Sequence, residues 1–132
     1  MIDLTATFLP TGPLRLVSRV ASLADDAITC ETDIAEHWSY AHHFPGDPVF
    51  PGCLMVELAA QATLLWGWAQ GHRGRPRLGR TSAEFHSPAT PADGMLITRS
   101  RVRKRRNVYF GEVEIAAGER AVASVSVVVA LA

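Results

Sequence analysis

The stretch CLMVELAAQATLLWGWAQG, residues 53–71, decides the fold. It predicts a helix of about five turns that ends near Gly71. Apolar side chains fall on nearly every face of this helix, so we expect it to be buried all round. In a chain of 132 residues, the efficient way to bury every face of one helix is to wrap an antiparallel sheet around it.

Strand-like stretches lie on both sides of this helix in the sequence. Before it, LRLVSRVASL and AITCETDI flank Asp25 and Asp26, which predicts a hairpin over residues 14–33. After Arg80 come MLITRSRV, NVYFGEVEI and RAVASVSVVVAL, the last two joined by the turn-like AAGE. One helix with about five strands predicts an α+β fold, with one sheet on one helix. We expect residues 1–132 to form one domain.

The composition is that of an ordinary folded protein, with 48% hydrophobic and 20% charged residues. Thirteen basic residues balance thirteen acidic ones, so no net charge draws the chain to nucleic acid or to an anionic membrane. No secretory signal or bilayer-length apolar run is visible, and we expect a cytoplasmic protein without membrane association. Cys30 and Cys53 lack metal-site spacing, so we expect reduced thiols and no metal.

The first chemical anomaly is a carboxylate inside the apolar helix. Glu57 is surrounded in the sequence by Leu, Met, Val and Ala residues, and burial among them disfavours its ionised form. Gln61 lies four residues further on, on the same face of the helix, so the two polar side chains can share one pocket. Taken alone, this pair favours a structural hydrogen bond over a catalytic role.

The second anomaly is His43, within the segment AHHFPGDPVFPG. Five Pro and Gly residues crowd into residues 45–52 and predict a rigid loop that holds the imidazole in one orientation. Histidine exchanges protons near neutral pH, although one isolated His favours a structural role. His43 and Glu57 together, joined by a loop that leads into a helix N-terminus, favour an acid and base pair beside an anion-stabilising helix end.

The segment HFPGDPVFPGCLMVELAAQ, residues 43–61, resembles the signature of the 3-hydroxyacyl-acyl-carrier-protein dehydratases, which have the hot-dog fold. The family pattern is His-Phe-Pro-Gly, a proline-rich link, Pro-Gly-(Val/Cys)-Leu, two residues, an acidic residue and Ala-Gln. Every element has its counterpart here at the same spacing. A weaker similarity continues through EFHSPATPADGM, residues 84–95, and the late strands, whereas the N-terminal third matches least.

The resemblance implies roles for seven residues of the segment. His43 would be the catalytic base and Glu57 the catalytic acid, with no metal or redox cofactor. The backbone N–H of Gly52, with that of Cys53, would bind the thioester oxygen. The remaining residues that would bind substrate or support the site are Gln61, Phe44 and Pro51. The family builds each site at a homodimer interface, with the His from one subunit and the acid from the other.

The chain also departs from the family pattern. Residue 42 is His where the family usually has Gly, and LPTGPL at residues 9–14 replaces a Leu-Pro-His-Arg-aromatic motif. These departures bear on substrate fit. Glu57 is the acid typical of the plain dehydratases, whereas the branch that also isomerises the double bond typically has Asp. The pair Gly52-Cys53 is seen in that second branch, so isomerase activity is not expected from Glu57 but stays open.

The resemblance implies dehydration of (3R)-3-hydroxyacyl thioesters on acyl carrier protein, in fatty acid or polyketide-type biosynthesis. Two alternatives remain: a hot-dog hydratase or thioesterase acting on CoA esters, and a catalytically silent hot-dog partner subunit. We expect a homodimer or a higher oligomer of dimers, or pairing with a paralogous hot-dog subunit. Residues 73–106 hold ten basic and two acidic side chains, which is typical of a solvated surface and gives little support to nucleic-acid binding. Because the resemblance implies an acidic acyl carrier protein as partner, we expect this basic region to be its docking surface.

Overall fold

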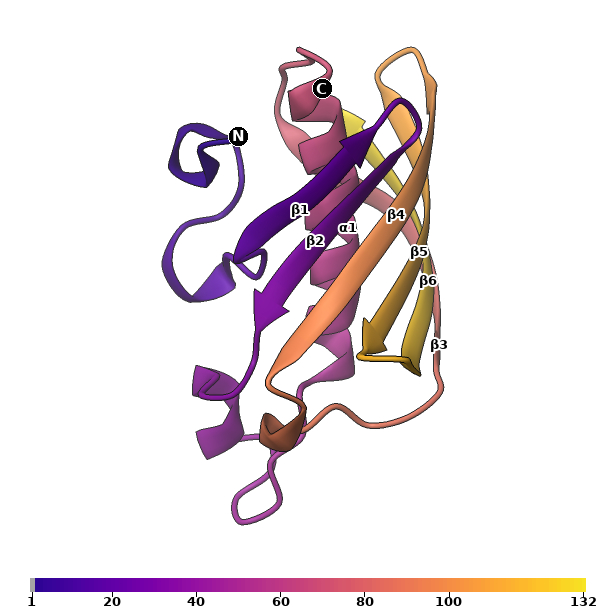
Figure 1. Cartoon of the computed structure of the whole chain (residues 1–132). Coiled ribbons are helices and arrows are strands. Elements are labelled where there is room, and N and C mark those ends of the chain that lie inside the picture. Colours follow the sequence, from indigo (N-terminus) through magenta and orange to yellow (C-terminus); the bar gives the residue numbers. More distant parts are fainter. Residues whose placement is uncertain (1) are drawn as a thin grey trace.

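The computed structural model describes residues 2–132 as one long helix packed against a six-stranded antiparallel sheet (Figure 1). Met1, the first residue of the expected domain, lies outside the described residues. The helix α1 spans Gly52–Ala69. The strands are β1 (Arg19–Ala24), β2 (Ala27–Asp33), β3 (Pro76–Phe85), β4 (Met95–Arg105), β5 (Val108–Ala117) and β6 (Arg120–Leu131). Short 3-10 turns are η1 (Leu4–Ala6), η2 (Gly12–Leu14), η3 (Trp38–Ala41) and η4 (Pro91–Asp93).

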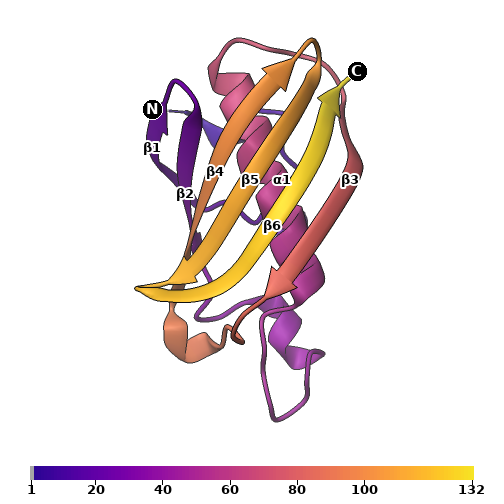
Figure 2. The ribbon, with the colours of Figure 1, turned by 90° about the vertical axis from the view of Figure 1, so that its right-hand side faces the viewer.

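The sheet has the strand order β1-β2-β4-β5-β6-β3 and curls around α1, as Figure 2 shows from the side. Each neighbouring pair is antiparallel. The predicted hairpin at Asp25 and Asp26 is confirmed, and so are the three late strands and the α+β fold with one sheet on one helix. Strand β1 begins at Arg19, later than the predicted start at Leu14, because the chain forms a 3-10 turn over Gly12–Leu14.

The predicted helix is confirmed in length but not in burial. From Leu58 to Gly67 every residue of α1 is buried. The expectation that the helix is buried all round is wrong for its first turns, where Cys53 is exposed and Leu54 and Glu57 are only partly buried. The sheet of the same chain does not enclose this end of the helix on every side.

Strand β3 was missing from the sequence prediction, which placed the late strands after Arg80. Its sequence PRLGRTSAEF has charged residues and a glycine and lacks the alternation that marks a half-buried strand. The structure explains this pattern, because β3 is an edge strand that pairs only with β6 within the sheet, and eight of its ten residues are exposed. Leu78 and Phe85 are large apolar side chains that stay about half exposed on this edge.

Helix and sheet approach closely at Gly111 of β5. The Thr63 hydroxyl of α1 forms a hydrogen bond of 2.8 Å with the Ser100 hydroxyl of β4 directly beside this glycine. A Cβ atom at residue 111 would overlap Thr63 Oγ1, so only glycine fits here without movement of the helix.

No helix within residues 2–132 is long and apolar enough to cross a membrane.

The close approach predicts the effect of a single methyl group. Gly111→Ala should lower the free energy of unfolding by about 1–3 kcal/mol, because overpacking forces helix and sheet apart. Adding Thr63→Ala should recover part of this loss by removing the overlapping hydroxyl. Urea denaturation monitored by Trp fluorescence measures both effects, and a Gly111→Ala protein as stable as the wild type would contradict the packing described.

Candidate active site

The loop that carries His43 is a tight turn of the backbone. The N–H of Phe44 donates to the carbonyl of Asp47 at 3.1 Å, and the N–H of Asp47 donates back at 2.9 Å. Pro45 and Gly46 form the bend, and Gly46 has a φ of 77°, as the third residue of a type II turn requires. The Val49 N–H donates to the carbonyl of His43 at 3.0 Å and closes the loop below the turn. The loop has the defined shape that the sequence predicts, and its rigidity stays a prediction.

This loop fixes the protonation pattern of the His43 ring. Nδ1 lies 3.1 Å from the carbonyl oxygen of Val49. A carbonyl oxygen only accepts hydrogen bonds, so Nδ1 carries the proton and donates, and in the neutral ring Nε2 keeps a free lone pair. The ring stacks on the exposed Phe44 with centroids 4.1 Å apart and is itself partly buried. His43 therefore presents Nε2 as a base in a defined orientation.

The helix α1 begins at Gly52, directly after this loop. Its N-cap residue is the buried Pro51, which provides no side-chain cap, so the first N–H groups of the helix lack intrahelical partners. The ring of Phe85 lies over Gly52, so closely that a Cβ at residue 52 would be 3.0 Å from it. The same two residues line a cavity of about 410 Å³ with Met55. The positive end of the helix dipole thus faces an open space.

Gln61 is buried, with 1% of its surface exposed. Its side chain forms three hydrogen bonds, two to the backbone of the N-terminal segment and one to Glu57. Its Oε1 accepts from the N–H of Leu16 at 2.9 Å, and its Nε2 donates to the carbonyl of Leu14 at 2.7 Å. Nε2 also donates to Oε2 of Glu57 at 2.9 Å. The amide therefore attaches the N-terminal segment to α1 and fixes the orientation of the Glu57 carboxyl group.

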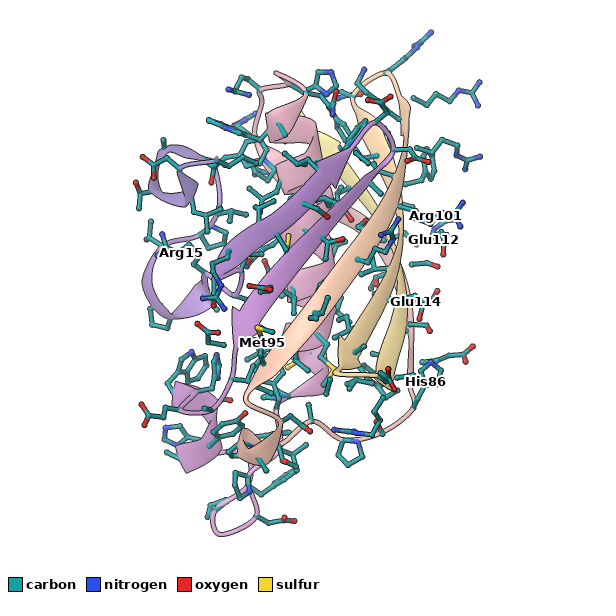
Figure 3. All side chains as sticks on the ribbon, in the orientation of Figure 1. Arg15, His86, Met95, Arg101, Glu112 and Glu114 are labelled. Carbon is teal, nitrogen blue, oxygen red and sulfur yellow. The ribbon has the colours of Figure 1, made fainter. Side chains whose placement is uncertain are left out.

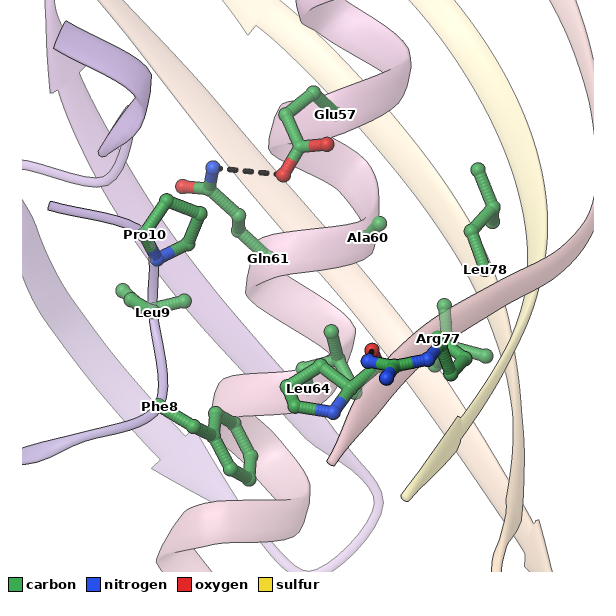
Figure 4. Close-up of a pocket in the computed structure, with 11 residues that line it drawn as sticks. Phe8, Leu9, Pro10, Glu57, Ala60, Gln61, Leu64, Arg77 and Leu78 are labelled. Atoms are coloured by element: carbon green, nitrogen blue, oxygen red, sulfur yellow. Dashed lines mark hydrogen bonds between the residues drawn. The ribbon is translucent and has the colours of Figure 1, made fainter. Parts of the chain in front are cut away.

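Glu57 lies at the wall of a cavity of about 330 Å³ between α1, β3 and the N-terminal segment (Figure 4). One carboxyl oxygen of Glu57 is engaged by Gln61, which leaves Oε1 for a ligand. The rest of the lining is mostly apolar. It consists of Phe8, Leu9, Pro10, Ala60, Gln61, Leu64, Pro76, Arg77, Leu78 and Val129.

The structure brings the expected site residues together in two groups. Glu57 and Gln61 share the cavity, whereas the cavity at the start of α1 contains Gly52. His43 and Phe44 lie on the preceding loop and line neither of these two cavities. Cys53 is exposed on the first turn of the helix. Neither of these two cavities therefore contains both His43 and Glu57.

Other titratable residues have structural surroundings. The ring of His37 packs on Phe50 and accepts a hydrogen bond from the N–H of Ser39, and burial lowers its pKa. Burial also raises the pKa of the Cys30 thiol to about 12, so this cysteine stays protonated. Throughout residues 2–132, no three His, Cys, Asp or Glu side chains are arranged to hold a metal ion.

Several residues of the Glu57 cavity were not found by sequence reasoning. Phe8 and Pro10 belong to the N-terminal segment, where the chain departs from the family motif. Arg77 and Leu78 belong to β3, the strand that the sequence pattern did not predict. The sequence carried a partial signal only for Pro10, through the Leu-Pro pair of LPTGPL.

Comparison with known proteins identifies the family. A family model described as a FabA-like domain matches residues 9–126. A 3-hydroxyacyl-acyl-carrier-protein dehydratase FabZ from Syntrophobacter fumaroxidans is 31% identical over 103 residues, which cover 74% of this chain and 69% of that protein.

Solved structures share the hot-dog fold. The dehydratase heterocomplex ApeI:P from Xenorhabdus doucetiae superposes with a TM-score of 0.79 at 18% identity, covering 95% of this chain and 88% of that chain. A thioesterase from Staphylococcus aureus, solved as a mutant, superposes with a TM-score of 0.68 at 13% identity, covering 84% and 89%. The fold is therefore common to proteins named as dehydratases and as thioesterases.

The hydrogen bonds of Gln61 predict a measurable cost for its removal. Gln61→Leu should lower the free energy of unfolding by at least about 2 kcal/mol, because two buried backbone groups lose their partners at about 1–3 kcal/mol each. Hydrogen exchange of the Leu16 N–H should also accelerate. Gln70→Leu, at the exposed end of α1, is the matched control and should change neither quantity. Equal stability of the two variants would show that the Gln61 hydrogen bonds are dispensable.

Proposed function

The chain belongs to the FabA-like family, and on that premise we propose that it removes water from (3R)-3-hydroxyacyl thioesters on acyl carrier protein, giving trans-2-enoyl thioesters. The whole described chain would act as one hot-dog dehydratase domain in fatty acid or polyketide-type biosynthesis. The observation that supports this most is the carboxyl group of Glu57, which Gln61 holds at the wall of a cavity with one oxygen free. The reaction needs no cofactor, because it only moves protons and breaks one C–O bond.

His43 is proposed as the base that takes the proton from C2 of the substrate. The Val49 carbonyl holds its Nδ1, so Nε2 is the atom that accepts this proton. As the C2–H bond breaks, negative charge develops on the thioester oxygen. The N–H groups of Gly52 and Cys53 at the start of α1 would donate hydrogen bonds to this oxygen, with the helix dipole in the favourable direction.

Glu57 is proposed as the acid that completes the elimination. Its Oε1 would give a proton to the hydroxyl on C3, so that the C3–O bond breaks, water leaves and a C2–C3 double bond forms. The hydrogen bond from Gln61 keeps the other oxygen engaged, which directs Oε1 toward the substrate. Phe44, which stacks on the imidazole, and Pro51, which precedes the helix, would shape the site around the thioester.

A second subunit is proposed to complete the site. His43 and Glu57 do not share a cavity within one chain, and the edge strand β3 leaves backbone groups and the side chains of Leu78 and Phe85 exposed. Antiparallel pairing of β3 with β3 of a second copy would cover this edge. We favour a homodimer. A paralogous hot-dog subunit is the alternative, in keeping with the heterocomplex among the structural neighbours.

The carrier protein is proposed to dock at the basic end of the molecule. Arg77 of β3 pairs with Ala130 of β6, which pairs with Val108 of β5, which in turn pairs with Arg105 of β4. The two basic segments, residues 73–80 and 101–106, therefore meet at the end of the sheet beside the end of α1 (Figure 1). Figure 3 shows that Arg101 extends this basic surface onto the outer face of the sheet, next to Glu112. In an antiparallel dimer, this end lies near the start of the partner's helix.

The catalytic assignment predicts the effect of two substitutions. His43→Ala and Glu57→Gln should each lower kcat on the carrier-bound substrate by about 10²–10⁴-fold, because one loses the base and the other the proton donor. Circular dichroism should show that both variants remain folded. Glu119→Gln, on the exposed turn between β5 and β6, is the matched control and should keep wild-type turnover. Near wild-type turnover in either site variant would refute its assigned role.

Mixed dimers test whether the site is shared. When His43→Ala and Glu57→Gln subunits are combined, a mixed dimer holds one intact site if the two groups come from different chains. Activity should then recover toward half of the wild-type value per mixed dimer. Recovery would be absent if both groups acted within one chain, or if the protein were monomeric by light scattering.

The docking proposal predicts a loss that depends on the substrate. Arg103, Lys104 and Arg105 changed together to Glu should weaken turnover of a carrier-bound acyl group and leave a small pantetheine thioester with the same acyl chain unaffected. Salt should act in the same selective way, because the Debye length falls from about 10 Å at 0.1 M to about 3 Å at 1 M ionic strength. Equal losses on both substrates, or no loss on either, would contradict docking at these residues.

A further inference from the structure

An exposed arginine at the rim of the Glu57 cavity takes no part in the proposed dehydration chemistry, although it belongs to the basic segment proposed for carrier docking. Arg77 of β3 lines the cavity across from α1. Its Nη1 donates to the carbonyl of Pro76 at 2.7 Å, and it takes part in none of the ion pairs formed within residues 2–132. Most of the five N–H donors of its guanidinium group are therefore free to bind a ligand.

Arg77 lies on the exposed edge strand β3, at the rim of this cavity. Its neighbour Leu78 also lines the cavity, and both residues pair in regular register with β6, before the register shift between Leu78 and Arg80. Figure 4 draws Arg77 and Leu64 among the residues that line the cavity.

The proposed chemistry sets the direction in which an acyl chain runs through the site. The proposed reaction places the thioester carbonyl, C1, at the N–H groups of Gly52 and Cys53 and places C3 at Glu57, further along α1, so the substrate would connect the two cavities that these residues line. The carbons beyond C3 then continue along the helix toward Leu64. Leu64 is seven residues beyond Glu57, or about 10 Å along the helix axis. The far end of the acyl chain thus arrives beside Arg77.

The cavity walls fit such a chain. Between Glu57 and Arg77 the lining is apolar, with Phe8, Leu9 and Leu64 among its residues. Its volume of about 330 Å³ is at the lower end of the range for small-molecule sites, about 300–1,000 Å³. An apolar middle with a free guanidinium at its end matches a chain that is hydrocarbon along its length and carries an acceptor group at its tip.

We propose that Arg77 binds a carboxylate at the far end of the acyl chain, so that the substrates are 3-hydroxyacyl thioesters with a terminal carboxyl group. This inference rests on the proposed dehydratase function, because the position of C1 and C3 sets the direction of the chain. A guanidinium and a carboxylate form two parallel hydrogen bonds, which makes Arg the residue suited to this recognition. A methyl-terminated chain would leave Arg77 without this partner.

The test compares two series of pantetheine thioesters, one with a methyl and one with a carboxylate terminus, over several chain lengths. Wild-type protein should dehydrate the carboxylate series with a kcat/KM about tenfold higher at the chain length that reaches Arg77. Arg77→Gln should abolish this preference and Arg77→Lys should keep part of it. Arg99→Gln, an exposed arginine on the outer face of β4, is the matched control and should retain the full preference.

Binding measured without turnover separates this inference from the proposed function. Saturated acyl-pantetheine amides with either terminus cannot lose water, and calorimetry gives their Kd values. Tighter binding of the carboxylate form that disappears in Arg77→Gln supports the subsite, even if no substrate is dehydrated and the proposed reaction fails. Dehydration of both series at equal rates, with equal Kd values that Arg77→Gln leaves unchanged, overturns the subsite and leaves the reaction standing.

A phosphate on the pantetheine arm is another anion that Arg77 can bind. Repeating the calorimetry with 4′-phosphopantetheine amides distinguishes the two sources. The proposal predicts that the effect of Arg77→Gln follows the acyl terminus and is the same with and without the phosphate. An effect that follows the phosphate and ignores the acyl terminus would overturn it.

Discussion

The buried amide of Gln61 is the interaction on which the candidate site depends. It is one side chain with three partners, the N–H of Leu16, the carbonyl of Leu14 and the carboxyl of Glu57. Because buried polar groups are costly when unpaired, this arrangement fixes the path of the N-terminal segment and the orientation of the acid together. The same segment then supplies Phe8 and Pro10 to the wall of the cavity.

A second constraint is the uneven cover of α1. The helix is buried from Leu58 to Gly67, and the first turns, with Glu57, stay open. The open side of the helix and the edge strand β3 line the same cavity. On β3 the apolar side chain of Leu78 is exposed, and covering it would contribute favourable hydrophobic burial. His43 projects from a loop outside this cavity. The proposed second copy would cover the exposed strand β3 and would also bring its own His43 to Glu57, through one interface.

The sequence was sufficient for the elements with strong local signals. The apolar run of α1, the alternating strands β4 to β6 and the Asp25-Asp26 turn all follow from periodicity and turn residues, and the structure confirms them. Strand β3 was missed because an exposed edge strand has no alternation to detect. The partial burial of Glu57 was missed because periodicity shows that a helix is apolar but not how much of it one chain covers.

The same distinction applies to the site. The pairing of Glu57 with Gln61 follows from their spacing of four residues, and the Pro and Gly residues predict the fixed loop around His43. The long-range partners of Gln61 cannot be predicted, because they depend on how the chain before β1 folds back onto the helix. Arg77 was likewise hidden, since its place at the cavity depends on the pairing of β3 with β6.

The most direct test of the central claim is the intact mass of an acyl carrier protein loaded with a (3R)-3-hydroxyacyl group and incubated with this protein. Dehydration predicts that the carrier loses the mass of one water molecule, while the acyl group stays attached. Hydration is the reverse of the same reaction, and it predicts that an enoyl-loaded carrier gains the mass of one water molecule. Release of the free carrier thiol, with the whole acyl group lost as a carboxylic acid, would identify a thioesterase and contradict the account.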